Sequence, residues 1–450
     1  MNMSKVVHWH HHHQRCSCCC WNKRCSFNYC RIFIFLVVTS IAFIFLLAVY
    51  TCKPMGHSCF GLSDGTPAPL SYYNAFLMGK VFKHSFSDAV LNKERKLNLE
   101  GEDVLIYLHI QKTGGATFGR HLVHNLDMNF PCECKPHVKK CMCLTRNSRR
   151  WLFSRHATGW MCGLHADWTE LTDCVDEWFK RNDVKSRKHR VYHYITFLRD
   201  PVKRFLSEWQ HVRRGATWKA ARLHCNGRDA TMEEVPFCFP GVDWSGVSFD
   251  EFMSCKHNLA FNRMTRMMAN LSKVNCYNQT GMADDVFSEI LLKSAKENLE
   301  ACAFFGLVEE QQKTQFLFEK TMGLKFIDNF RQKLKTHVSR LEVTEEMTKR
   351  VVERNILDIE LYQYAKDLFL QRVAYMERKL GYTVDEYFNH IRDADDAEED
   401  DAEEVEVDEY GDEEDIEDDD DDGVDFYPGK NGTGVGIMPN SSTVQWNSVR

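Results

Sequence analysis

The most constraining feature of the sequence is a strand–turn–helix pattern that begins at residue 104. A short apolar run, VLIYLH (104–109), leads into the glycine-rich turn QKTGG and then into a helical stretch over residues 117–126. Apolar runs of this length form strands that are buried on both faces of a parallel sheet. Repeated strand–helix units of this kind indicate an α/β domain with a largely parallel central sheet flanked by helices.

Two later segments repeat the pattern. The apolar run 192–198 ends at Arg199-Asp-Pro, and Pro201 suits the first turn of a helix that we expect to reach about residue 214. A third candidate strand covers 303–308 and is followed by a helix from Gln311, and long helical periodicity returns over 344–379. These units place the folded domain within residues 101–392.

The first turn, HIQKTGGATF (109–118), has the composition of an anion-binding loop. Such a turn directs backbone N–H groups and the positive end of a helix at an anion, and Lys112 adds a charge. The lysine precedes the glycines, so this is not a Walker A loop, which disfavours a nucleotide kinase. The alternative is a structural glycine turn with a solvated lysine.

A second anion site is expected at Arg199, because ligands of open α/β sheets bind at the carboxyl ends of the strands. Ser207 follows two helical turns later and reaches the same phosphate only if its helix packs back over the loop. Alternatively, Arg199 and Asp200 form a structural ion pair. Two phosphate sites at two strand ends indicate a nucleotide with phosphates at both ends of its ribose.

The N-terminal region predicts a membrane anchor. Residues 32–50 (IFIFLVVTSIAFIFLLAVY) carry no charge, are long enough to cross a bilayer, and lack a small-residue cleavage site after them. Five basic and no acidic residues precede them, so residues 1–31 are predicted to be cytosolic, with type II topology. Residues 51–100 read as a stem. Distal glycosylation sequons begin at Asn270, Asn278, Asn431 and Asn440, in agreement with a lumenal body.

The net charge of −7 combines two opposite regions. Residues 393–422 contain 22 acidic residues and no Lys or Arg, whereas residues 51–392 contain 50 basic and 41 acidic residues. The body is therefore basic, which suits a polyanionic ligand. The tail, 393–450, cannot bury a core and is predicted to be disordered.

Long stretches of the sequence carry a family resemblance. They are HIQKTGGATFGRHLV, TGWMCGLHADWTEL, LRDPVKRFLSEW, HVRRGATWK and AFFGLVEEQQKTQFLFE. Over roughly residues 100–380 the chain resembles the heparan-sulfate 6-O-sulfotransferases, type II Golgi membrane enzymes that use 3′-phosphoadenylyl sulfate as donor. The resemblance implies a P-loop-like sulfotransferase fold, a donor with two phosphate sites, and heparan sulfate as acceptor.

The resemblance also implies roles for particular residues. His165 matches the catalytic base, although a histidine packed among aromatic residues is the ordinary alternative, and Lys112 would stabilise charge on the departing phosphate. The donor-binding positions are His109, Ile110, Gln111, Lys112, Thr113, Gly114, Gly115, Ala116, Thr117, Arg199, Ser207 and Gln332. The positions that hold the sugar chain are Lys139, Lys140, Arg155, Trp160, His165, His211 and Trp218.

The sequence departs from the family pattern at two places in these motifs. Ala116 stands where the family commonly has Thr, and Arg155 is followed by His-Ala instead of an aromatic residue and Ser. Both changes leave Lys112 and His165 in place. They are candidates for tuning donor affinity or acceptor preference.

Cysteine spacing gives separate expectations. CECKPHVKKCMC (132–143) offers four thiols, but its C-x-C pairs lack the usual C-x-x-C spacing of zinc ligands. In an oxidising lumen disulfides are the preferred interpretation, and no metal site is expected. By proximity in sequence, Cys162 with Cys174 and Cys225 with Cys238 are further pairing candidates.

Together, these features predict a lumenal Golgi sulfotransferase that acts on the 6-hydroxyl of glucosamine in heparan sulfate, with no nucleic-acid partner. Two alternatives stay open: a glycosaminoglycan sulfotransferase of other positional specificity, and a membrane-tethered heparan-binding protein without catalysis. For the acidic tail, a polyanion mimic that competes for the acceptor groove and a solvated spacer are both open.

Overall fold

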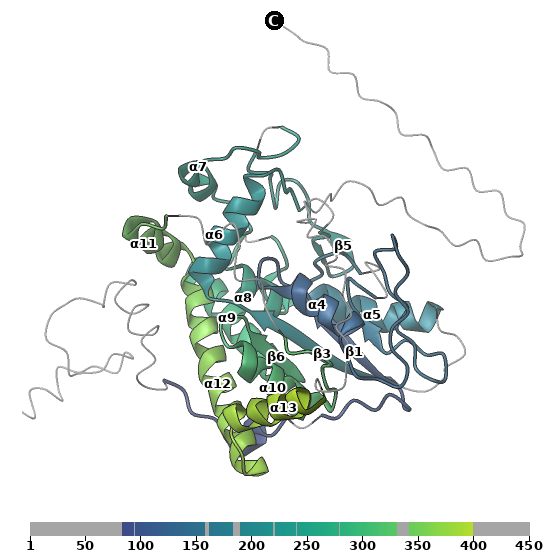
Figure 1. Ribbon diagram of the computed structural model, residues 1–450. Helices are drawn as coiled ribbons and strands as arrows, with labels where there is room; N and C mark the ends of the chain where they lie inside the picture. Colours follow the sequence, from purple (N-terminus) through teal and green to yellow (C-terminus); the bar gives the residue numbers. More distant parts are fainter. Residues whose placement is uncertain are drawn as a thin grey trace, which may run out of the picture. The chain divides into compact units, whose positions relative to one another are not determined.

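The computed structural model describes residues 83–93, 95–157, 162–182, 190–218, 221–239, 241–278, 280–330 and 342–398 (Figure 1). Several predicted features lie outside these ranges, namely the membrane segment 32–50, Trp160, Gln332, Asn431, Asn440 and residues 399–450. Among the helices that are described, none has the length and apolar character needed to cross a membrane.

The central feature is a four-stranded, fully parallel sheet with the strand order β2–β1–β3–β6. Its strands are β1 (Asp103–Leu108), β2 (Leu152–Phe153), β3 (Val191–Leu198) and β6 (Phe304–Leu307), and a separate hairpin pairs β4 (His224–Cys225) with β5 (Arg228–Asp229). The helices are α3 (Asp88–Leu91), α4 (Gly115–His124), α5 (Trp168–Asn182), α6 (Pro201–Val212), α7 (Phe249–Ser254), α8 (Arg263–Met268), the 3-10 helix η1 (Leu271–Val274), α9 (Asp284–Ala301), α10 (Gln311–Met322), α11 (Glu345–Arg354), α12 (Ile356–Leu380) and α13 (Val384–Glu398).

Helices cover both faces of the sheet, and the side chains of β6 show which helix covers which face. Phe304 contacts Phe118 of α4 and Phe318 of α10, with ring centroids 6.4 and 5.2 Å apart. The next residue, Phe305, lies 6.2 Å from Phe369 of α12. Because successive side chains of a strand point to opposite faces, α4 and α10 cover one face and α12 covers the other.

α5 packs on the α12 face. The Trp168 ring lies 5.0 Å from the Tyr194 ring. Tyr194 and Thr196 point to the same face of β3, and Thr196 is paired with Phe305, whose side chain faces α12. On the α4 face, Gly306 permits close packing, because a Cβ there would come within 2.6 Å of Phe197 and Thr314. The sheet is thus buried on both sides, as its continuous apolar strands predicted.

The three predicted strands and the helices that follow them are confirmed to within about two residues. β2 was not predicted, because two residues carry no periodic signal and become a strand only by pairing with Leu105 and Ile106. The predicted helical stretch 344–379 is two helices, broken at Asn355. The buried Asn355 side chain donates to the Val351 carbonyl and accepts from the Asn262 N–H, which competes with a continuous helix.

The folded body is longer at both ends than the sequence predicted. The stem was expected to reach residue 100, yet Leu91 is buried in the core, and the backbone N–H groups of Lys83 and His84 donate to the Asp367 carboxylate of α12. At the other end α13 continues to Glu398 and so includes the first six residues of the predicted tail.

Candidate functional site

The glycine-rich turn between β1 and α4 is tightly folded. Lys112 and Gly114 have φ angles of +61° and +74°, and the Thr113 hydroxyl donates to the Ile110 carbonyl at 2.9 Å. At Gly115, the first residue of α4, a Cβ would lie 2.1 Å from the His109 ring, so only glycine fits. The turn thereby presents the N-terminal N–H groups of α4 beside Lys112, as expected of an anion-binding loop.

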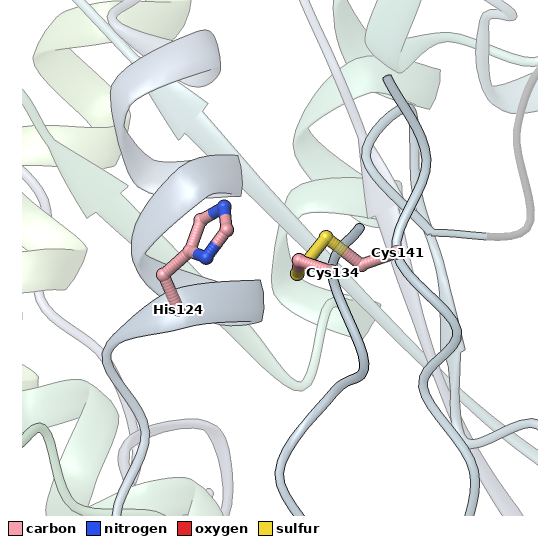
Figure 2. A group of neighbouring side chains, drawn as sticks. All are labelled: His124, Cys134 and Cys141. Carbon is pink, nitrogen blue, oxygen red and sulfur yellow. A yellow bond between two sulfur atoms is a disulfide. The ribbon is translucent and has the colours of Figure 1, made fainter. Parts of the chain in front are cut away.

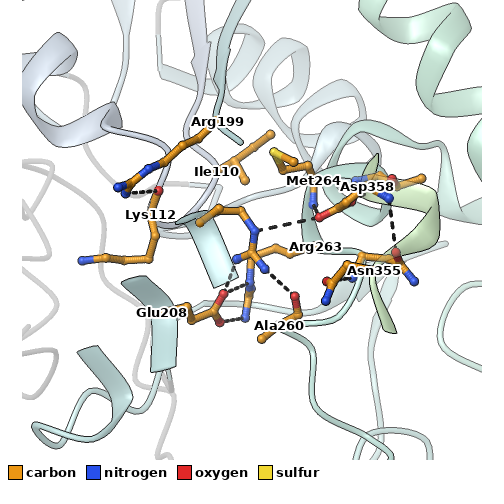
Figure 3. Close-up of polar contacts among 12 residues, drawn as sticks. Ile110, Lys112, Arg199, Glu208, Ala260, Arg263, Met264, Asn355 and Asp358 are labelled. Atoms are coloured by element: carbon orange, nitrogen blue, oxygen red, sulfur yellow. Dashed lines mark hydrogen bonds and ion pairs between the residues drawn. The ribbon is translucent and has the colours of Figure 1, made fainter. Parts of the chain in front are cut away.

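Arg199 joins this loop from the neighbouring strand. β1 and β3 are paired up to Leu108 and Thr196, so both end at the same edge of the sheet. One terminal nitrogen of Arg199 donates to the Lys112 carbonyl at 3.2 Å, as Figure 3 shows. The buried Nε of Arg199 has no hydrogen-bond partner. The two predicted anion sites are therefore adjacent, and the second one has a buried N–H donor without a partner.

Ser207 lies on α6, whose first turn is capped by Asp200. The Asp200 carboxylate accepts from the Lys203 N–H at 2.9 Å, and Pro201 occupies the first helical position, as predicted. Asp200 thus has a capping role. Ser207 is buried on this helix.

His165 is buried directly beside the glycine-rich turn between β1 and α4. Its Nδ1 lies 3.1 Å from the His109 carbonyl oxygen, which can only accept, so Nδ1 carries the proton and Nε2 carries the lone pair. Nε2 is buried and has no hydrogen-bond partner. Burial and the nearby charge of Arg155 lower the pKa of His165 to about 3, with smaller contributions from Arg263 and Lys112. A neutral imidazole with a free Nε2 is the form required of a general base.

Three predicted sugar-binding residues surround His165. The Trp218 ring lies edge-on to the His165 ring at 5.3 Å, and it also contacts His211 of α6 at 5.0 Å. Arg155 lines a small cavity of about 20 Å³ together with His109. The structure thus gathers residues from four separate segments of the sequence around one imidazole.

A buried ionic cluster holds α6 in place. Glu208 on α6 pairs with Arg204 of the same helix and with Arg263 of α8, which contacts both carboxylate oxygens (Figure 3). Asp358 of α12 lies 3.8 Å from Arg204 and accepts from the Thr265 hydroxyl at 2.8 Å. We call Arg204, Glu208, Arg263 and Asp358 the α6 cluster.

The α6 cluster was missed by the sequence reasoning. Although burial tends to raise the pKa of Glu208, the charges of Arg263 and Arg204 hold it below its usual value, so Glu208 stays ionised. The cluster fixes the helix that carries Ser207 and His211.

A second buried acidic pair lies at the start of α5, close to His165 in sequence. Asp167 accepts from the Glu170 N–H and from the Tyr277 hydroxyl, and burial raises its pKa to about 6. Burial and the neighbouring Asp167 raise the pKa of Glu170 to about 9, although Arg222 lies 3.7 Å away. At neutral pH Glu170 is therefore protonated and adds no negative charge at the start of α5.

The cysteine-rich loop is a hairpin closed by two disulfides, Cys132–Cys143 and Cys134–Cys141. His124 of α4 lies beside the second one, and its ring and the two sulfur atoms fall within 4.8 Å of one another (Figure 2). A zinc site would require free thiolates, which the disulfides exclude. Lys139 and Lys140 are exposed on this hairpin, and no described contact joins them to His165.

The structure confirms one of the two sequence-local cysteine pairs and corrects the other. Cys162 pairs with Cys174, as predicted. The predicted Cys225–Cys238 pair is wrong: the bonds are Cys225–Cys276 and Cys238–Cys255. The β4–β5 hairpin brings Cys225 against η1, 3.8 Å from the Ser272 hydroxyl, whereas Cys255 closes α7.

Two of the four predicted sequons are described. Asn270 is half-buried, and its side-chain oxygen caps η1 by accepting from the Ser272 N–H. Asn278 is also half-buried, and its side-chain oxygen accepts from the Thr280 N–H and hydroxyl at 3.0 and 2.6 Å.

Comparison with known proteins agrees with this geometry. The model of the sulfotransferase family matches residues 95–365. A chicken (Gallus gallus) heparan-sulfate 6-O-sulfotransferase 2 is 53% identical over 301 residues, or 66% of this chain and 75% of the relative. Heparan-sulfate 6-O-sulfotransferase 1-B of Danio rerio and heparan-sulfate 6-O-sulfotransferase 1 of Homo sapiens are each 48% identical over 76% of this chain and 85% and 84% of their own lengths.

The matched residues 95–365 include the four strands of the sheet, the glycine-rich turn and His165. The chain belongs to the sulfotransferase family, within the group of heparan-sulfate 6-O-sulfotransferases.

Proposed function

We propose that this protein transfers sulfate from 3′-phosphoadenylyl sulfate to the 6-hydroxyl of glucosamine residues in heparan sulfate. The names of its relatives suggest heparan sulfate as the acceptor and the 6-hydroxyl as the position that is sulfated. The residues at the carboxyl edge of the sheet support the identity of the donor. The buried, unpaired Nε of Arg199 and the hydroxyl of the buried Ser207 suit one phosphate, and the turn 109–117 suits the phosphosulfate end. When bound, the donor supplies the sulfuryl group.

His165 acts as the general base in this proposal. Its Nε2 accepts the proton of the sugar hydroxyl as the hydroxyl oxygen bonds to sulfur, and its Nδ1 stays hydrogen-bonded to the His109 carbonyl. That bond fixes the tautomer and the ring orientation, so the base needs no rearrangement before the reaction. The His165 imidazole stays neutral because burial and three nearby cations, Arg155, Arg263 and Lys112, disfavour its protonation.

Lys112 supplies the positive charge that offsets the negative charge of the departing phosphate. Its backbone is held in the left-handed conformation within the loop and is fixed by the Arg199 contact to its carbonyl. The ammonium group stabilises the charge that develops on the departing phosphate oxygen as the bond to sulfur breaks. Positioning by the loop, Arg199 and Ser207 accounts for the rest of the donor's orientation.

The acceptor lies over Trp218 and His211 in this proposal. Indole and imidazole faces pack against sugar rings, and Arg155, Lys139 and Lys140 pair with sulfate and carboxylate groups of the chain. Arg155 is the best supported of these cations, because its charge acts directly on His165.

The cellular setting is part of the proposal and rests on sequence. The uncharged segment 32–50 and the basic residues before it support a type II anchor in the Golgi membrane, with the body in the lumen. Five disulfides in the described chain are in keeping with an oxidising compartment.

The free Nε2 of a fixed, neutral His165 beside the phosphate loop is the observation that carries the proposal. The detergent-solubilised chain should transfer labelled sulfate to heparan sulfate, and His165→Ala should abolish transfer while retaining donor binding. His257→Ala, which changes an exposed histidine, is the matched control and should keep full activity. Heparan binding without transfer by the unaltered chain would instead identify a binding protein.

A further inference from the structure

A hollow lined by three lysines lies away from the edge of the sheet that carries Arg199 and the glycine-rich turn. The hollow of about 280 Å³ is lined by Lys96, Glu319, Lys320, Gly323, Leu324, Lys325, Met376, Leu380 and Tyr387. The N–H groups of Arg95 and Leu97, just before β1, donate to the Thr321 and Met322 carbonyls at the end of α10. The hollow therefore lies at the amino-terminal edge of the sheet, whereas the phosphate loop and Arg199 lie at the carboxyl edge.

Three lysines of this hollow, Lys96, Lys320 and Lys325, form no ion pair with any carboxylate in the described part of the chain. The one acid in the hollow, Glu319, is already engaged, because it accepts from the Gln315 amide, the Phe326 N–H and the Tyr387 hydroxyl. The hollow is thus a basic rim over an apolar floor.

Helix ends explain only one of these lysines. Lys320 is in the last turn of α10, where the helix dipole favours a cation, and its Nζ lies 3.8 Å above the Tyr387 ring. Lys96 and Lys325 are exposed residues outside any helix. Their convergence on the hollow needs a different explanation, and an acidic ligand provides one.

The acidic tail of the same chain contains a segment that matches this surface. Residues 404–410 read EVEVDEY, with Val405 and Val407 alternating with Glu404, Glu406 and Asp408. In an extended segment such alternation places the apolar side chains on one face and the carboxylates on the other. Later in the tail, the run from 417 to 422 is acidic throughout and lacks the apolar face.

The connection is long enough. Tyr387, which lines the hollow, and Glu398 lie 11 residues apart on α13, a separation of about 16 Å along the helix axis. The seven residues from Glu398 to Val405 can span up to about 24 Å. The tail can therefore turn back along α13 and reach the hollow.

We propose that residues 404–410 dock in this hollow, with Val405 and Val407 on its apolar floor and their flanking carboxylates on Lys96, Lys320 and Lys325. The tail is then held at the amino-terminal edge of the sheet. In that position it does not act as a polyanion mimic in the acceptor groove. The proposal does not depend on the catalytic assignment.

Zero-length carbodiimide cross-linking of the full chain at low salt, followed by peptide mapping, tests this docking. Amide links from Glu404, Glu406 or Asp408 should go mainly to Lys96, Lys320 and Lys325. Replacing Val405 and Val407 together by Ser leaves the charge unchanged and should reduce these links by about fivefold. The matched control is Val424→Ser, in the same tail beyond the docking segment, which should leave them unchanged.

Three results would overturn the proposal. The first is a concentration of links at Lys139 and Lys140, which would place the tail at the acceptor face. The second is an even spread over exposed lysines, which would indicate a solvated spacer. The third is links that join two different chains in a mixture of isotope-labelled and unlabelled protein, which would show that the occupant is a second copy.

Discussion

The α6 cluster and the carboxyl edge of the sheet are both buried and rich in charge, but they differ in how their polar groups are paired. In the α6 cluster each charge has an opposite charge within 4.0 Å: Glu208 pairs with Arg204 and Arg263, and Asp358 pairs with Arg204, although Arg204 Nε makes no hydrogen bond. At the sheet edge, Arg199 Nε, Gln111 Oε1 and His165 Nε2 are buried without a hydrogen-bond partner.

This difference separates structure from function. A buried polar atom without a partner costs free energy, so natural proteins keep few of them unless a ligand or a reaction uses them. The paired cluster holds α6 in place, whereas the unpaired edge is prepared for an anionic donor and a sugar hydroxyl. The two regions should therefore respond to mutation in different ways.

Glu208→Ala should have the largest effect, and it should be an effect on stability. Removing this carboxylate leaves two buried arginines without their shared partner, and breaking a buried ion pair of this kind costs about 3–5 kcal/mol. Chemical denaturation measures the change. Glu234→Ala removes a carboxylate from an exposed arginine pair and serves as the control, with little expected change. Equal losses in both variants would remove the distinction between the α6 cluster and a surface pair.

Lys112→Ala should act on turnover and leave stability nearly unchanged. The charge of Lys112 acts on His165, so Lys112 lies near the proposed base, and its loss should lower kcat by about 10²–10³-fold through weaker stabilisation of the departing phosphate. Steady-state kinetics at saturating donor measures this. Lys139→Ala is the control and should mainly raise the acceptor KM. A large loss of stability with normal kcat would assign Lys112 to the structure.

Arg199→Lys should raise the donor KM by about tenfold, because a lysine keeps the charge but loses the fork that reaches both the Lys112 carbonyl and a phosphate. At saturating donor kcat should change much less. Arg214→Lys, an exposed arginine just beyond α6, should leave the donor KM unchanged. Calorimetric titration with adenosine 3′,5′-bisphosphate provides an independent check, and unaltered affinity would contradict the phosphate assignment.

The pH dependence should be the smallest effect. Because burial and Arg155 lower the pKa of His165 to about 3, the base remains neutral between pH 7.5 and 5, and kcat/KM for the acceptor should stay nearly constant. A histidine with an ordinary pKa near 6.5 would lose about 30-fold at pH 5. Arg155→Gln should move the acidic limb to higher pH, since it removes a charge that opposes protonation. An acidic limb near pH 6.5 in the unaltered enzyme would contradict the buried, neutral imidazole.

The sequence predicts those parts of the fold that depend on local pattern. Apolar runs predict the strands at 104–109, 192–198 and 303–308, and all three are confirmed. The glycines after the first strand predict the turn there, and Pro201 predicts the start of α6. Adjacency of Arg199 and Lys112 follows from two parallel strands that end at one edge. By contrast, β2 exists only through its pairing with β1, so its two residues give no signal of their own.

The missed features depend on contacts between distant residues. Glu208 and Arg263 are 55 positions apart, and Asp358 lies still further along the chain, so no local pattern joins them. Cys225 forms its disulfide with Cys276, and not with Cys238 nearby in sequence, because the fold brings Cys225 and Cys276 together. The grouping of His165 with Trp218 came from family resemblance, and only the structure shows which nitrogen of the histidine is free.

The most direct test of the central claim is a disaccharide analysis of heparan sulfate after incubation with the solubilised chain and labelled donor. Enzymatic digestion followed by chromatography locates the new sulfate on each disaccharide. The account predicts label at the 6-position of glucosamine with the unaltered chain and none with His165→Ala. Label at another position, or equal labelling by both proteins, would contradict it.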